Sequence, residues 1–64
     1  MANVAGGTVH REVEVKVNTG DWLPKRTRHK RLAAAELEAA QVRDRGGEPR
    51  VVRVARDGTR EEVD

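Results

Sequence analysis

The chain has 64 residues, of which 38% are charged, yet its formal net charge is only +2. Ten Val, three Leu and one Trp, with no Ile, Phe or Tyr, leave material for one thin core in a single domain, residues 1–64. Without Cys, a disulfide and a thiolate metal site are excluded, and His10 and His29 are too few and too distant to predict a zinc site.

Small domains with little core usually need a disulfide, a metal or a partner subunit. Since the first two are excluded, we expect a homo-oligomer, most simply a homodimer, or a complex with a protein partner. No apolar run approaches the roughly 18 residues of a membrane span, and the N-terminus lacks a secretory pattern. These features and the absence of Cys predict a cytoplasmic protein. The Arg-rich and Ala-rich composition is typical of a GC-rich genome and fits a bacterial or phage accessory protein.

Residues 8–17 alternate strictly between two sets of side chains. One set is Val9, Arg11, Val13, Val15 and Val17, and the other is His10, Glu12, Glu14 and Lys16. This period of two predicts a strand with its valines on the core and its second face in water. Gly6-Gly7 permits a turn before the strand, and we expect residues 1–7 and 64 to be loose.

A turn is predicted next, because Asn18, Thr19, Gly20 and Asp21 are turn residues. A short second strand can then run from Trp22 to about Arg26 and pair back on the first. Pro24 would confine this strand to an edge of the sheet, since proline cannot donate a ladder hydrogen bond.

Residues 27–45 favour a helix, with Thr27 as its N-cap and Gly46-Gly47 as its stop. The helix would carry two apolar stripes, one of Leu32, Ala35, Ala39 and Val42, the other of Ala33, Leu37 and Ala40. One stripe can cover the sheet, and the other would meet water or a second subunit. The first stripe is our candidate partner interface. Alternatively, the alanines serve helix formation alone.

The segment 50–63 reads as a hairpin around Asp57-Gly58. A two-residue loop would set Arg53 opposite Glu62, whereas a three-residue loop with Gly58 in the left-handed conformation would set it opposite Glu61. The fold class is therefore α+β: a small antiparallel sheet of three to four strands, covered by one helix, in the order strand, optional strand, helix, strand, strand.

Catalysis is not expected, because the chain lacks Ser and Cys and has no phosphate-binding loop. The paired carboxylates at Glu36/Glu38 and Glu61/Glu62 lie beside basic residues and read as solvated charge. We expect no cofactor, no metal and no small-molecule substrate.

Residues 25–31 form the most concentrated charge in the chain. They contain five cations and no acid: Lys25, Arg26, Arg28, Lys30 and Arg31. Cations are unfavourable at a helix N-terminus, so their presence at the predicted helix start points to bound phosphate. Arg53 and Arg56 are supplementary candidates. The alternative is a solvated run neutralised by Asp21, Glu36 or the acidic C-terminal residues.

Two functions follow from these features. The leading hypothesis is a small non-catalytic interaction module that self-associates and binds or regulates a protein partner. The alternative is a nucleic-acid-binding protein that contacts phosphates through residues 25–31. Any such binding would be directed at the backbone, because the only aromatic residue, Trp22, is expected in the core.

Overall fold

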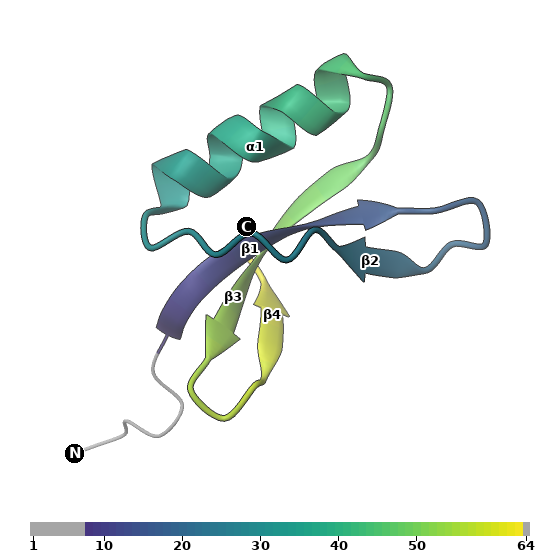
Figure 1. Ribbon diagram of the computed structural model, residues 1–64. Helices are drawn as coiled ribbons and strands as arrows, with labels where there is room; N and C mark the ends of the chain where they lie inside the picture. The colour runs from purple at the N-terminus through teal and green to yellow at the C-terminus, as the bar shows by residue number, and fades with distance from the viewer. Residues whose placement is uncertain (1–7, 64) are drawn as a thin grey trace.

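The strand predicted at residues 8–17 is β1, Thr8–Lys16, in a computed structural model that describes residues 8–63. Residues 1–7 and 64, which we expected to be loose, lie outside the described residues. The other elements are β2 (Trp22–Pro24), α1 (Leu32–Asp44), β3 (Pro49–Ala55) and β4 (Arg60–Glu62) (Figure 1).

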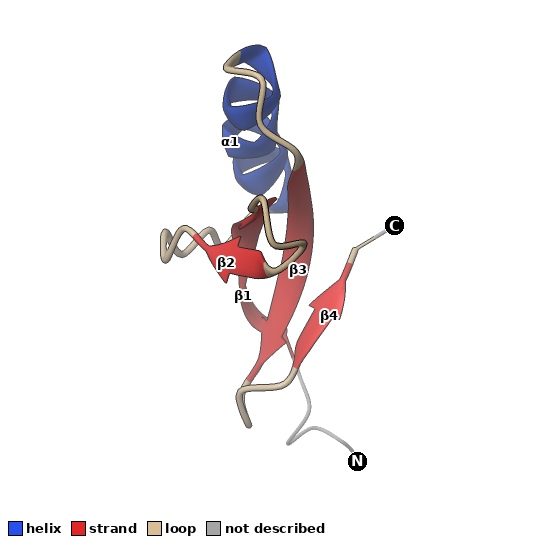
Figure 2. Ribbon diagram, turned by 90° about the vertical axis from the view of Figure 1, so that its right-hand side faces the viewer, coloured by secondary structure: helices blue, strands red, loops and turns tan. Residues whose placement is uncertain are grey.

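The four strands form one antiparallel sheet in the order β2-β1-β3-β4. The helix α1 packs against β1 and β3 on one face of this sheet, and no helix covers the opposite face within residues 8–63 (Figure 2). The predicted α+β class is confirmed. The described helix, α1, is too short and too polar to cross a membrane.

The edge strand β2 ends at Pro24, two residues earlier than predicted. It pairs with the end of β1, where Val15 lies opposite Leu23. The position of β2 at the edge of the sheet is the one that proline requires.

The hairpin of β3 and β4 has the three-residue loop. Arg53 lies opposite Glu61, and Gly58 has a φ of 90°, which is the left-handed conformation that favours glycine. The Arg53 and Glu61 side chains form the expected cross-strand ion pair. Of the two registers considered from the sequence, the second is confirmed.

The helix starts at Leu32 and not near Thr27, so the predicted N-cap was wrong. Before the helix, His29 exchanges two backbone hydrogen bonds with Arg11 of β1, which a helix beginning at Thr27 would break. The helix ends where predicted, before Gly46. Gly47 allows the chain to turn back closely, because a Cβ there would lie 2.7 Å from Cγ1 of Val42.

The core beneath α1 is built from small side chains. Val13, Ala35 and Ala39 are buried there, with Val42 and Val51 packed around them. Alanines on the inner helix stripe let the helix approach the sheet closely, so little apolar volume is needed to fill this layer.

The opposite face of the sheet is also buried, contrary to the prediction that one face of β1 is wet. Val52 and Val54 are buried on this face, and Glu12 and Glu14 are only 5% and 4% exposed. The acids are covered by long arginine side chains from β3 and β4, and no second layer of helices is needed.

Candidate functional site

The basic segment, defined as residues 25–31, runs from the end of β2 along the outer edge of β1. The Lys25 N–H donates to the carbonyl of Val13 at 2.9 Å. Further along, His29 and Arg11 exchange two backbone hydrogen bonds, of 2.8 and 2.6 Å. Both ends of the segment are therefore fixed to the sheet.

Side chains add two more attachments at the C-terminal end of the segment. Nε2 of His29 lies 2.7 Å from Oε1 of Glu38 on α1, and both side chains are largely buried. A terminal nitrogen of Arg11 donates to the carbonyl of Lys30 at 2.8 Å, although its buried Nε has no partner among residues 8–63. His29 thus points inward and ties the basic segment to the helix.

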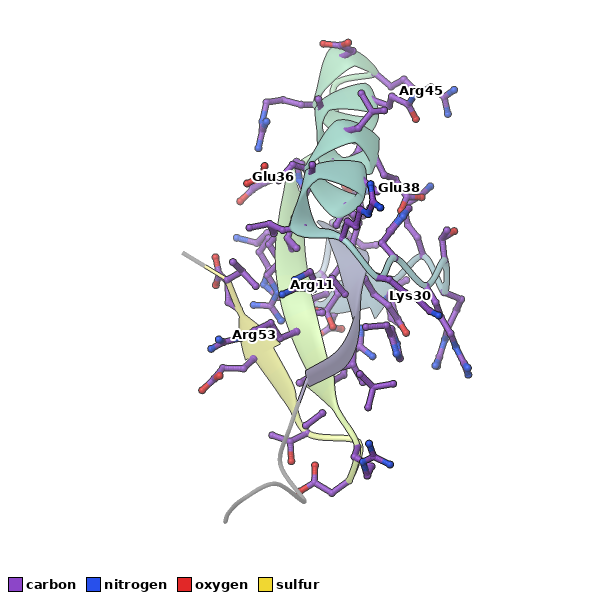
Figure 3. All side chains as sticks on the ribbon, turned by 90° about the vertical axis from the view of Figure 1, so that its left-hand side faces the viewer. Arg11, Lys30, Glu36, Glu38, Arg45 and Arg53 are labelled. Atoms are coloured by element: carbon purple, nitrogen blue, oxygen red, sulfur yellow. The ribbon has the colours of Figure 1, made fainter. Side chains whose placement is uncertain are left out.

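The five cations of the basic segment are exposed, and none of them forms an ion pair within residues 8–63. Elsewhere in the described chain, Arg50, Arg53 and Arg60 are each paired with a glutamate. Figure 3 shows Lys30 on one side of the sheet with other nitrogen-tipped side chains, and Arg53 on the opposite side. Of the ten lysines and arginines without an ion pair among residues 8–63, five therefore lie together in this segment at one edge of the sheet.

The basic segment leads directly into the N-terminus of α1. Arg31 is the N-cap residue but makes no side-chain capping hydrogen bond, and the first turn contains no acid. The partial positive charge of the helix N-terminus is thus added to that of Lys30 and Arg31. The sequence analysis expected Arg28, Lys30 and Arg31 in the first turns of a helix that begins near Thr27, but in the structure all five cations precede α1.

The supplementary candidates lie apart from the segment. Arg53 is paired with Glu61, and Arg56 is exposed in the turn between β3 and β4. Trp22 is half-buried on the face opposite α1, with the guanidinium of Arg50 4.3 Å from its ring centroid. One face of this ring is covered by a cation, so that face is not presented for stacking on a base.

The candidate partner interface faces the protein's own core. Ala35 and Ala39 are buried against the sheet, and Leu32 and Val42 are half-buried. Ala35 and Ala39 therefore serve the fold, whereas Leu32 and Val42 keep part of their surface in contact with water. The second stripe is the outer one, and its Leu37 is 63% exposed.

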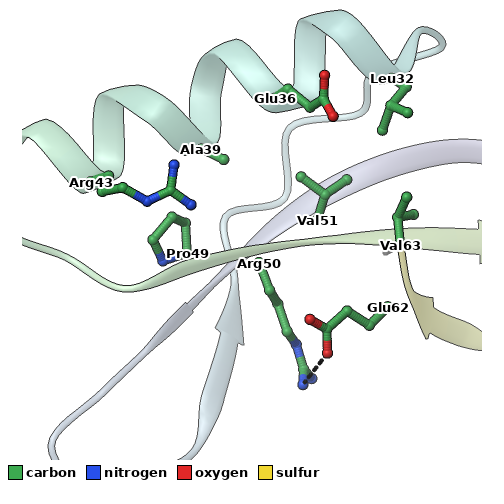
Figure 4. Close-up of a pocket in the computed structure, with 9 residues that line it drawn as sticks. All are labelled: Leu32, Glu36, Ala39, Arg43, Pro49, Arg50, Val51, Glu62 and Val63. Atoms are coloured by element: carbon green, nitrogen blue, oxygen red, sulfur yellow. Dashed lines mark ion pairs between the residues drawn. The ribbon is translucent and has the colours of Figure 1, made fainter.

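A groove of about 340 Å³ lies between α1 and the β3–β4 side of the sheet. Its walls include Leu32, Val51 and Val63, which point into the gap in Figure 4. Arg50 and Glu62 border the groove, but their side chains point away from the helix and lie 3.9 Å apart. The groove arises because one helix covers only part of the sheet.

A buried charge network covers the face opposite α1, and the sequence did not reveal it. Arg60 bridges the two acids, since its Nε donates to Glu14 at 2.8 Å and a terminal nitrogen donates to Glu12 at 3.0 Å. Arg50 donates to the other Glu14 oxygen at 2.7 Å, and His10 Nε2 lies 2.7 Å from the other Glu12 oxygen. All four carboxylate oxygens thus have a partner.

Glu12 is held in its ionised form by this network. Burial is the largest influence on its pKa and raises it, but hydrogen bonds from His10 and Arg60 and their charges together lower it more. The pKa of Glu12 therefore lies below its ordinary value. The arrangement stabilises the sheet and leaves no free carboxylate for acid–base chemistry.

Within residues 8–63, no three His, Asp or Glu side chains are grouped so that they could hold a metal ion. Comparisons with protein-family models, curated proteins and solved structures find no match.

Proposed function

We propose that the protein binds nucleic acid through the phosphate backbone, and that the basic segment is the contact. The observation that carries this proposal is that five exposed cations lie in seven consecutive residues without an ion pair among residues 8–63. Other cations, such as Arg43, Arg45 and Arg56, also lie outside ion pairs among residues 8–63, so the basic segment is distinguished by the density of its charge and by the absence of any acid within it.

Physical reasoning favours phosphate as the ligand. Like charges held together at an edge repel one another, and a line of phosphates removes that repulsion while releasing counterions. The attachments at Lys25 and His29 hold the segment in place before binding, which lowers the entropy lost on association. Because Trp22 is covered by Arg50, binding depends on backbone charge and not on base identity.

The experiment compares two charge-reversal variants by fluorescence anisotropy with labelled duplex DNA. Arg28→Glu with Arg31→Glu changes the basic segment, whereas Arg43→Glu with Arg45→Glu changes exposed cations near the end of α1. Both pairs lower the net charge from +2 to −2, so total charge is matched.

The segment variant is expected to bind at least about tenfold more weakly, with a salt slope shallower by about two or more. The helix-end variant is expected to keep most of the wild-type affinity. Equal losses in both variants would mean that net charge alone drives binding, which contradicts the proposal. Circular dichroism of each variant verifies that the fold is intact.

The second candidate is the non-catalytic protein-interaction module. The groove beside α1 and the 63% exposed Leu37 favour it, because both leave apolar surface in contact with water. Light scattering tests self-association at high protein concentration. Twice the chain mass of 7.1 kDa supports a homodimer, and a mass of 7.1 kDa removes it.

A further inference from the structure

The basic segment bulges outward between its two attachments to β1. Lys25 donates to Val13, and His29 exchanges hydrogen bonds with Arg11. On β1 only Glu12 lies between those two partners, whereas residues 26–28 lie between the attachments on the segment. Three residues opposite one cannot continue the ladder, so the segment bends away from β1 there.

The backbone of this bulge has free hydrogen-bond donors. Within residues 8–63, none of the N–H groups of residues 26–28 donates to a backbone carbonyl. Arg26 has a φ of 68°, which makes it the one residue other than glycine in the left-handed region of the described chain. Arginine is strained in this conformation, and backbone strain of this kind concentrates at ligand-binding sites.

We propose that the bulge of residues 26–28 is a binding site for a single phosphate group, an inference that rests on the proposed function and specifies its point of contact. Free N–H groups next to a left-handed residue form the anion-binding concavities known as nests. Thr27 supplies a hydroxyl, and Arg26 and Arg28 supply guanidinium groups, which are the donors best suited to phosphate oxygens.

The cations outside the bulge act by long-range charge and not by directed hydrogen bonds. Lys25, Lys30 and Arg31 attract the rest of the polyanion through charge, and only the bulge holds a phosphate by directed hydrogen bonds. A free phosphate ion and a phosphodiester offer the same oxygens, so both are tested as ligands.

The experiment follows the backbone amides by two-dimensional NMR during titration with inorganic phosphate, and separately with a short oligonucleotide. Sodium chloride at equal ionic strength is the control. We expect both phosphate ligands to shift the amide signals of Arg26, Thr27 and Arg28 in a saturable way, and chloride to leave them unchanged.

Two variants separate directed binding from charge. Arg26→Gly removes the guanidinium and suits the left-handed backbone, whereas Arg31→Gln removes a cation outside the bulge. Arg26→Gly is expected to weaken inorganic phosphate binding about tenfold, the effect of losing a charge-assisted hydrogen bond. Arg31→Gln is expected to weaken oligonucleotide binding and to leave phosphate affinity within about twofold.

The outcomes distinguish this inference from the proposed function. The phosphate site would be overturned, while nucleic-acid binding stands, if the oligonucleotide binds but leaves the amide signals of residues 26–28 unshifted. It would also be overturned if the two variants weaken the binding of inorganic phosphate equally. Saturable shifts with inorganic phosphate alone would support the site and reject nucleic acid as its source. Absence of both interactions would overturn both proposals.

Discussion

Removing Arg60 is predicted to destabilise the protein more than removing any exposed arginine. Its guanidinium bridges Glu12 and Glu14, whose side chains are each 6% exposed. In Arg60→Ala, the two carboxylates remain on neighbouring positions of one strand face and lose the cation between them. Each keeps one partner, His10 or Arg50.

The expected loss follows from burial. Breaking a fully buried ion pair by removing one partner costs about 3–5 kcal/mol. Arg60 is 29% exposed and the acids keep one partner each, so we expect a loss of about 2–3 kcal/mol. A domain of this length is stable by only roughly 3–10 kcal/mol, so the effect is large.

The assay is urea unfolding monitored by the fluorescence of Trp22, the single tryptophan, which lies against Arg50 in the same network. Arg53→Ala is the matched control, because Arg53 is also paired with a glutamate but is 46% exposed. The control is expected to lose less than about 1 kcal/mol. If the free energies of unfolding of the two variants agree within about 0.5 kcal/mol, the burial argument is refuted.

The pH dependence gives a second readout of the same network. Because the pKa of folded Glu12 is lowered, its contribution to stability is present above the ordinary glutamate value of about 4.3 and is lost as the pH falls through the folded pKa. Arg60→Ala removes part of the cause. The difference in unfolding free energy between wild type and variant should therefore shrink as the pH falls below the ordinary glutamate pKa.

Three further predictions concern the core, the start of α1 and the turn after its end. Val13 and Val52 are buried on opposite faces of the sheet, so Val13→Ala and Val52→Ala should each lower the free energy of urea unfolding by about 2 kcal/mol. An unchanged free energy in Val52→Ala would contradict a core on both faces. Arg31→Asp should add a helix cap, raise stability by about 1 kcal/mol and weaken DNA binding, and unchanged binding would be the contrary result. Gly47→Ala should lose about 1–3 kcal/mol, because its Cβ would crowd Val42, and unchanged thermal stability would show that the turn adapts freely.

The alternation of β1 and the Asp57-Gly58 turn were sufficient to predict β1 and the β3–β4 hairpin, but not the order of the strands in the sheet. Both are local signals: a period of two specifies a strand, and an Asp-Gly pair specifies a hairpin. The alternation did not reveal that Glu12 and Glu14 are buried, because their covering partners, Arg50 and Arg60, are distant in sequence. A strand pattern separates two faces but does not say what lies over each.

The helix start was missed for a related reason. Thr27 is an acceptable N-cap on local grounds, but the backbone hydrogen bonds between His29 and Arg11 on β1 are incompatible with a helix that begins at Thr27. The basic segment itself was found from composition alone. Its attachment to the sheet edge and the left-handed Arg26 depend on tertiary pairing, which no local pattern encodes.

The salt dependence of duplex DNA binding tests the central claim most directly, namely that the unpaired cations of the basic segment neutralise backbone phosphates. If all five act, a plot of log affinity against log salt concentration for the wild-type protein should have a slope of roughly −4 to −5. A slope near zero, or no binding at low salt, would contradict the claim.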